Sequence, residues 1–358
     1  MLLFICILFF CLFVEFVRKL LPNKIINAIC IIFIFLACSI MPAIKNITVG
    51  TDTNMYVNFF SMNMTYAEWW AIAGIEPGFA FCIKILQGVG LENYFYYFLF
   101  FSLLYNGLTI SAIYKISSGK YLSLIIYLTC SSLYFLHFNV LRQSIALAFF
   151  IYSLTYLVNG KYLKSYLFIL LATLFHFSAI ILFAVPLIYK SLRKHPVFII
   201  ISSLFFLLLY SNASVLLSFV GDIIGTTKYA AYNKENNFGG GYFIFCALVF
   251  SIALYFLLKT KLKDNDKYIF FTYLLFMAFI TWICMLVFGL KYDGPGRIIN
   301  YFYVGILFVI PDWFKVLNEK YKPLLFLFIV LFSFAIFYYV FFISGLHAVF
   351  PYTINNYL

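Results

Sequence analysis

The feature that most constrains the fold is a succession of long apolar runs separated by short clusters of Lys and Arg. Hydrophobic residues make up 65% of the 358 residues and charged residues only 10%. No water-soluble core of this size could bury so much apolar surface, which excludes a soluble domain. We predict an all-α polytopic membrane protein, because helices satisfy their own backbone hydrogen bonds in lipid. No linker interrupts the pattern, so residues 1–358 are expected to form a single integral membrane domain.

The basic clusters predict the orientation of the chain in the membrane. Lys and Arg are enriched in cytoplasmic loops, so we assign six clusters to the cytoplasmic side. They are Arg18, Lys19 and Lys24; Lys115 and Lys120; Lys161 and Lys164; Lys190, Arg193 and Lys194; Lys259, Lys261, Lys263 and Lys267; and Lys315, Lys320 and Lys322. The other basic residues then fall on the outer face: Lys45, Lys84, Arg142, Lys228, Lys234, Lys291 and Arg297. This topology accounts for the net charge of +12, and we expect no nucleic-acid partner.

The apolar runs between these clusters predict about twelve crossings with both termini outside. The expected helices are 2–17, 25–41, 94–114, 121–138, 143–158, 165–176, 178–189, 197–212, 241–258, 268–290, 298–314 and 323–343. The pair 165–176 and 178–189 is too short for full spans of roughly 20 residues each. It forms either two short crossings or a re-entrant hairpin with His176 near its tip.

Three segments between crossings are expected on the outer face. They are two loops, at residues 42–93 and 211–241, and a short turn at residues 291–297. Within the first loop, Pro77 suits the first turn of a helix, while Lys84 argues against a full span. We therefore predict an outer-face half-helix from Pro77 to about Gly90. The second loop ends in a Gly-rich stretch, which predicts a flexible segment.

Two outer-face arginines are candidates for binding an anion. Arg142 precedes Gln143 at the start of a crossing, and Arg297 follows a Gly- and Pro-rich turn, at a helix start where the dipole favours negative charge. The planar guanidinium offers a fork of donors that suits phosphate. Alternatively, Arg142 extends to lipid headgroups, and Arg297 forms a surface pair with Asp293. Tyr301 continues the polar face of Arg297 into the membrane.

Three further outer-face residues could handle a proton. Asp52 and Glu76 are carboxylates able to accept a proton from a sugar hydroxyl, and a neutral His176 could do the same. Each also has a structural interpretation. Asp52 could cap a helix, Glu76 could complement a helix dipole, and His176 could make a helix-packing hydrogen bond.

Other classes of protein are less consistent with the sequence. It contains no D-x-D, Walker A or H-E-x-x-H motif, so we expect no metal and no cofactor. A lipid-linked oligosaccharide flippase or other transporter should carry charges through the depth of the bilayer and show internal repeats. Here the candidate charges gather at one face, which favours chemistry at the outer surface.

Five short motifs, taken in their order along the chain, resemble the signature of the EpsG-like proteins, bacterial polysaccharide polymerases of the Wzy type. The resemblance covers about residues 50–305. The motifs are Gly50-Thr51-Asp52 with Tyr56, Glu76-Pro77-Gly78-Phe79, Arg142-Gln143-Ser144-Ile145-Ala146, Phe175-His176-Phe177-Ser178-Ala179, and Gly296-Arg297 with Tyr301. The order also fits an O-antigen ligase less well than a polymerase.

The resemblance implies a multi-pass glycosyltransferase of GT-C-like architecture in the bacterial inner membrane, with its active site on the periplasmic face. It would transfer a growing glycan from undecaprenyl diphosphate to the non-reducing end of another lipid-linked repeat unit. The products would be O-antigen, capsule or exopolysaccharide, and a Wzz-type chain-length regulator would be a partner. Arg142 and Arg297 would bind the diphosphate, and one of Asp52, Glu76 and His176 would deprotonate or orient the acceptor. The supporting residues would be Tyr56, Gln143, Asp293 and Tyr301.

Overall fold

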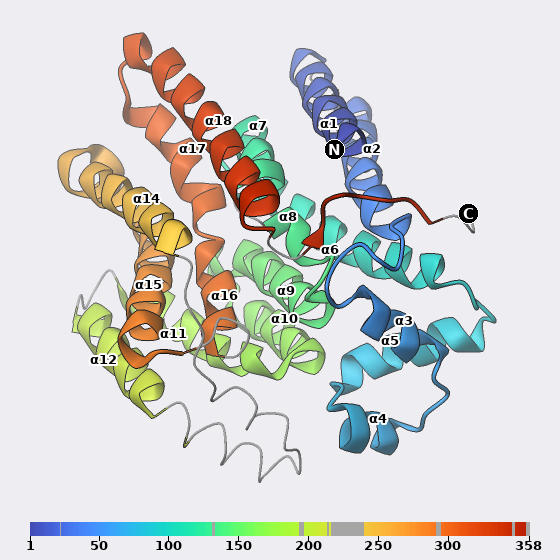
Figure 1. The fold of residues 1–358 in the computed structure, drawn as a ribbon. Helices are drawn as coiled ribbons and strands as arrows, with labels where there is room; N and C mark the ends of the chain where they lie inside the picture. Colours follow the sequence, from blue (N-terminus) through green and yellow to red (C-terminus); the bar gives the residue numbers. More distant parts are fainter. Residues whose placement is uncertain are drawn as a thin grey trace.

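The computed structural model describes residues 1–21, 23–130, 133–192, 197–212, 215, 240–290, 295–345 and 348–355 (Figure 1). Over these residues the chain is helical, apart from turns, connecting segments and an isolated antiparallel bridge between Lys45 and Ile354. The predicted all-α class is therefore confirmed for the described part of the chain.

The helices follow one another closely along the chain. The N-terminal half contains α1 (Leu2–Leu20), α2 (Lys24–Ala43), α3 (Thr53–Ser61), α4 (Tyr66–Ala73), α5 (Pro77–Gly88), α6 (Tyr94–Ile116), α7 (Lys120–Ile125), the π-helix η1 (Ile126–Cys130), α8 (Leu133–Leu136), α9 (Leu141–Leu157) and α10 (Tyr162–Phe175). The C-terminal half contains the 3₁₀ helix η2 (Phe177–Phe183), α11 (Ala184–Leu192), α12 (Val197–Ser211), α14 (Gly240–Lys259), η4 (Lys261–Asp264), α15 (Asp266–Phe288), η5 (Pro295–Ile298), α16 (Ile299–Tyr303), α17 (Ile306–Val316), η6 (Glu319–Tyr321), α18 (Lys322–Tyr338) and the π-helix η7 (Tyr339–Ile343).

Helical structure lies over every predicted apolar segment. Among the described residues, five helical stretches are long and apolar enough to cross a membrane: Lys24–Ala43, Tyr94–Ile116, Asp266–Phe288, Gly296–Val316 and Glu319–Ile343. The other predicted crossings correspond mainly to shorter apolar helices, such as α9 with 17 residues and α10 with 14. The protein is therefore membrane-embedded, while the count of about twelve crossings stays a prediction.

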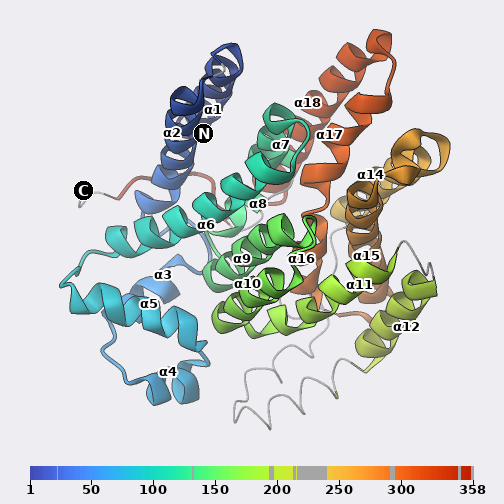
Figure 2. The same cartoon turned by 180° about the vertical axis from the view of Figure 1, so that it is seen from behind.

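The helix hairpins agree with the distribution of the basic clusters. In both views, the α1–α2 and α17–α18 hairpins turn on the same side of the molecule, the upper side in Figures 1 and 2. Two of the predicted cytoplasmic clusters lie at these turns. In the interior, α9 packs against α6 and α10, and α2 packs against α1 and α6. Most residues of α9 are buried, so Arg142 lies in the first turn of a central helix.

The predicted first outer loop, residues 42–93, contains a group of three short helices, α3, α4 and α5, away from those hairpin turns (Figure 1). Helix α5 runs from Pro77 to Gly88, with Glu76 at its N-cap and proline in its first turn. The predicted short helix is therefore present and ends two residues before the expected limit. Helix α4 starts with a capping box between Thr65 and Glu68, which satisfies its first amide groups.

The chain departs from α-helix at the end of α10. His176 is extended, with φ −155° and ψ 116°, and it separates α10 from η2. The structure thus contains two short helical segments around His176, which is compatible with both predicted arrangements, short crossings or a re-entrant hairpin. The Gly-rich end of the second outer loop, residues 236–239, lies outside the described residues, and so does Asp293.

Candidate active site

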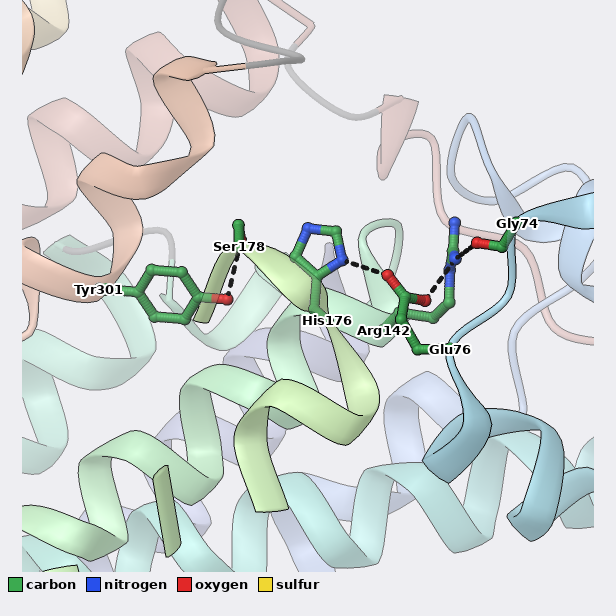
Figure 3. Close-up of polar contacts among 6 residues, drawn as sticks. All are labelled: Gly74, Glu76, Arg142, His176, Ser178 and Tyr301. Atoms are coloured by element: carbon green, nitrogen blue, oxygen red, sulfur yellow. Dashed lines mark hydrogen bonds and ion pairs between the residues drawn. The ribbon is translucent and has the colours of Figure 1, made fainter. Parts of the chain in front are cut away.

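Glu76, Arg142 and His176 form one cluster, in which Glu76 makes an ion pair with Arg142 and a hydrogen bond with His176 (Figure 3). Arg142 Nη1 donates to Glu76 Oε2 at 2.5 Å, and His176 Nδ1 lies 3.0 Å from Glu76 Oε1. Each carboxylate oxygen therefore has its own partner. The three side chains come from the start of α5, the start of α9 and the end of α10, so the fold brings together residues that are far apart in the sequence.

The position of Glu76 follows from the local structure of the Glu76-Pro77-Gly78 motif. Glu76 has extended backbone angles at the N-cap of α5, and its side chain does not cap its own helix. Gly78 lies directly against α10, because a Cβ atom at this position would be 2.8 Å from the carbonyl oxygen of Leu174. Only glycine permits this close approach. The start of α5 therefore packs two residues away from His176.

Arg142 uses only part of its hydrogen-bonding capacity within the cluster. Its Nη1 atom donates to Glu76 and also to the carbonyl of Gly74 at 2.9 Å. The Nε atom is buried and has no hydrogen-bond partner among the described residues. The Tyr56 hydroxyl lies close enough to interact with the guanidinium. Arginine offers five donors, so this guanidinium retains donors for an anionic ligand.

The electrostatic environment assigns different protonation states to Glu76 and His176. Burial alone would raise the Glu76 pKa, but Arg142 and His176 more than offset it and hold the pKa well below its ordinary value. For His176, burial lowers the pKa and outweighs the opposing influence of Glu76. At neutral pH the carboxyl is ionised and the imidazole is neutral. A neutral ring that donates from Nδ1 to Glu76 presents Nε2 as an acceptor.

The second candidate arginine is tied to the same helix as the first. Gln143 Nε2 donates to the carbonyl oxygen of Arg297 at 2.7 Å, so the residue after Arg142 holds the turn that carries Arg297. Arg297 lies in η5 and is partly exposed. Tyr301 is buried and its hydroxyl lies 3.2 Å from Ser178 Oγ, which joins this segment to the His176 motif (Figure 3).

Asp52 lies beside the cluster, outside its hydrogen-bond network. It occupies the N-cap position of α3, but its side chain makes no capping hydrogen bond. The alternative prediction, that the Asp52 side chain caps a helix, is therefore wrong. The Asp52 carboxylate accepts from Thr51 Oγ1, its backbone N–H donates to Asn139 Oδ1, and its carbonyl oxygen accepts from the Tyr56 amide. Of the three proton-handling candidates, the structure therefore places Glu76 and His176 in one cluster with Arg142.

Lys45 is a fully buried residue that no motif in the sequence marks as a candidate. Its Nζ donates to Thr53 Oγ1 at 2.7 Å and to the Phe138 carbonyl at 2.5 Å, which fastens the first outer loop to the turn before Arg142. Burial lowers the Lys45 pKa to about 7. Gly50 packs on the same turn, since a Cβ atom there would be 2.4 Å from Asn139 Oδ1. The sequence offered one signal for this residue: Lys45 is a lysine predicted on the outer face, whereas lysines are enriched in cytoplasmic loops.

Comparison with known proteins agrees with these motifs. Residues 26–354 match the EpsG family, and this range contains every candidate residue described above. No match was found among curated proteins or among solved structures. Because the match extends over nearly the whole length, the chain belongs to the EpsG family.

Proposed function

We propose that this protein polymerises lipid-linked repeat units in the synthesis of O-antigen, capsule or exopolysaccharide. It transfers the growing glycan from undecaprenyl diphosphate to the non-reducing end of another carrier-linked repeat unit. Membership of the EpsG family suggests a polymerase-type role in polysaccharide synthesis. The observation that carries the proposal is the buried cluster of Glu76, Arg142 and His176, with the Arg297 turn bonded to the same helix.

The two arginines provide the binding site for the diphosphate. The donor's glycosidic bond breaks between the anomeric carbon and the diphosphate oxygen, so negative charge grows on the leaving group. Arg142 retains unused donors in a buried setting, where a preorganised charge stabilises a transition state strongly. Arg297 contributes a second positive charge from η5, positioned by Gln143.

His176 acts as the general base in this mechanism. Its Nε2 atom takes the proton from the acceptor hydroxyl as that oxygen bonds to the anomeric carbon, and the diphosphate leaves with the electron pair of the broken bond. Glu76 is a poor base because its pKa is held well below its ordinary value. It positions Arg142 and fixes the tautomer of His176, as an orienting carboxylate does in other acid–base pairs.

The proposed topology places this chemistry on the periplasmic face of a bacterial inner membrane. The basic turns of the α1–α2 and α17–α18 hairpins would be cytoplasmic, with about twelve crossings arranged as in GT-C-like glycosyltransferases. The donor's diphosphate is the leaving group, so the reaction uses no nucleotide and no cofactor. A Wzz-type regulator would set the chain length from the same face.

Reconstitution of the purified protein with its lipid-linked repeat unit tests the proposed activity. The wild type should form a ladder of polymer on a gel, and Arg297→Ala should reduce it strongly, because it removes one positive charge from the leaving-group site. Lys84→Ala is the matched control, since Lys84 is an outer-face cation that bonds to Asn63. Full polymerisation by Arg297→Ala, or movement of the lipid across the membrane without polymer formation, would contradict the proposal.

A further inference from the structure

An apolar cavity adjoins the cluster on the side of α4, α10 and η2. It has a volume of about 590 Å³, within the range of roughly 300–1,000 Å³ that is usual for ligand pockets. Its walls include Trp70 of α4, Leu174 of α10 and Phe177 of η2. A cavity of this size and composition binds hydrocarbon in preference to a sugar or an ion.

One end of the cavity is continuous with the proposed active site. Of the described residues that line it, only Glu76 is charged, and Pro77 lies beside it. The hydroxyl of Thr173, another lining residue, is satisfied by the carbonyl oxygen of Leu170 at 2.7 Å. The charged end is therefore at Glu76, and most of the remaining lining residues are apolar, with Tyr66 adding a phenol.

The other end of the cavity reaches the apolar surface of the protein. Leu170 and Ile180 both line it, and they are 48% and 53% exposed. In a membrane-embedded chain, exposed leucine and isoleucine on short apolar helices face lipid. The cavity thus extends from a polar site to a lipid-facing wall, a shape that suits a molecule with a charged head and a long hydrocarbon tail.

We propose that this cavity holds the isoprenoid tail of the lipid-linked substrate next to its diphosphate. This assignment rests on the proposed function for the identity of the lipid. The diphosphate lies at Arg142, and the first isoprene units run past Pro77 between Trp70 and Leu174, then leave along α10 into the bilayer. The occupant is one linear hydrocarbon chain, whose single head group lies at Arg142, the partner of Glu76 at the charged end of the cavity.

Two variants of α10 separate this cavity from the surrounding lipid-facing surface. Leu170→Trp adds bulk inside the cavity. Leu167→Trp makes the same change at a residue of α10 that is 53% exposed and does not line the cavity. Wild-type protein should show a KM at least about tenfold lower for a repeat unit on an eleven-isoprene diphosphate than on a three-isoprene diphosphate. Leu170→Trp should remove this preference with little change in kcat, while Leu167→Trp should keep it.

Photolabelling gives a second measurement that does not depend on polymerisation. The probe is an undecaprenyl diphosphate with a diazirine on an isoprene unit near the head group. It should label the α4 and α10–η2 peptides in the wild type and in Leu167→Trp, and Leu170→Trp should reduce the label.

The two measurements distinguish the failure of each proposal. Absence of polymer with normal labelling would overturn the proposed reaction and leave the tail site standing. Polymer formation with no tail-length preference, or with an unchanged preference in folded Leu170→Trp, would overturn the tail site. Equal labelling of these peptides by a diazirine-bearing phosphatidylglycerol would also overturn it, by showing that any membrane lipid fills the cavity.

Discussion

Two carboxylate–arginine pairs, Glu15–Arg18 and Glu76–Arg142, each contain a buried carboxylate and differ in how many guanidinium nitrogens have hydrogen-bond partners. Near the α1–α2 turn, the Glu15 carboxylate accepts hydrogen bonds from Arg18 Nε at 2.6 Å and from Arg18 Nη2 at 2.7 Å. The Tyr114 hydroxyl donates to the same carboxylate. Arg18 Nη1 donates in turn to Asn27 at 3.0 Å. Every nitrogen of this guanidinium therefore has a partner within the protein.

The Glu76–Arg142 pair is assembled differently. Glu15 and Arg18 are three residues apart in one helix, whereas Glu76 and Arg142 come from separate helices and His176 from a third. A single nitrogen, Nη1, makes both of the Arg142 hydrogen bonds to Glu76 and Gly74. The Arg142 pair also adjoins a cavity through Glu76.

The comparison shows that a buried carboxylate paired with an arginine does not by itself indicate a functional site. Removing two charges from water is costly, and a buried pair is weak evidence even for stability. The Glu15–Arg18 pair fastens α1 to α2 and α6 and leaves little capacity for a ligand. The Arg142 cluster leaves donors unused beside a cavity, which is the property expected of a binding site.

Charge-conserving substitutions of Arg142 and Arg18 should give the largest difference in polymerisation activity between the two pairs. Lysine keeps the positive charge but cannot present a planar fork of donors. We expect Arg142→Lys to reduce polymerisation roughly 10²- to 10³-fold, and Arg18→Lys to lower the melting temperature with unchanged turnover per folded molecule. Gel assays of polymer together with thermal unfolding would measure both effects. Equal losses of turnover in the two variants would remove the distinction between the pairs.

His137 and His176, the two histidines among the described residues, offer a similar contrast of slightly smaller size. His137 stacks on Tyr105 and lies near Ser102, away from Glu76. His176→Gln should lose roughly 10²-fold or more in kcat, because glutamine can bond to Glu76 but cannot accept the proton. His137→Gln should retain turnover once corrected for folded protein. A normal kcat in His176→Gln would show that another residue is the general base. Asp52→Asn would then be the next variant to assay.

Two glycines of α5 test how the cluster is held together. Gly78→Ala would bring a Cβ atom within 2.8 Å of the Leu174 carbonyl, whereas the same change at Gly88 meets nothing within 4 Å. We expect Gly78→Ala to separate α5 from α10, with a cost of about 1–3 kcal/mol in stability and roughly a tenfold loss of turnover. Gly88→Ala should leave both quantities unchanged or slightly improve stability. Steady-state kinetics and thermal unfolding of the pair would measure this, and identical behaviour would exclude close packing as the role of Gly78.

The sequence predicted the helices well because the dominant signal was strong and local. Long apolar runs bounded by basic clusters leave few alternatives to membrane helices, and helical structure lies over each expected segment. The start of the short helix α5 was predictable from Pro77, while its place at the outer interface, inferred from the charge of Lys84, stays a prediction. The break at His176 was predictable because the two runs beside it are too short for full spans.

The contacts within the site could not be derived from local pattern. Nothing in the sequence indicated that Glu76 would bond to both Arg142 and His176, since these residues are 66 and 100 positions away. The pairing of Glu15 with Arg18 was not predicted, because Glu15 lies inside an apolar run and Arg18 was assigned to a cytoplasmic basic cluster. Lys45 was counted only as an outer-face charge, because its burial depends on how the first outer loop packs on the turn before Arg142.

The smallest expected effect is a shift in pH dependence that again distinguishes the two carboxylates. A general base works when it is deprotonated, so kcat/KM should fall as the pH drops through the His176 pKa. Burial lowers that pKa, while the Glu76 carboxylate raises it. Glu76→Gln removes the raising influence, so the acid limb of the profile should move to lower pH, on top of a loss of activity from the weaker hold on Arg142.

Glu15→Gln should leave the profile in place, because Glu15 bonds to Arg18 and Tyr114 and not to the proposed base. An acid limb that stays fixed in Glu76→Gln would show that the titrating base is not in contact with Glu76, and the two carboxylates would then be alike in serving structure alone.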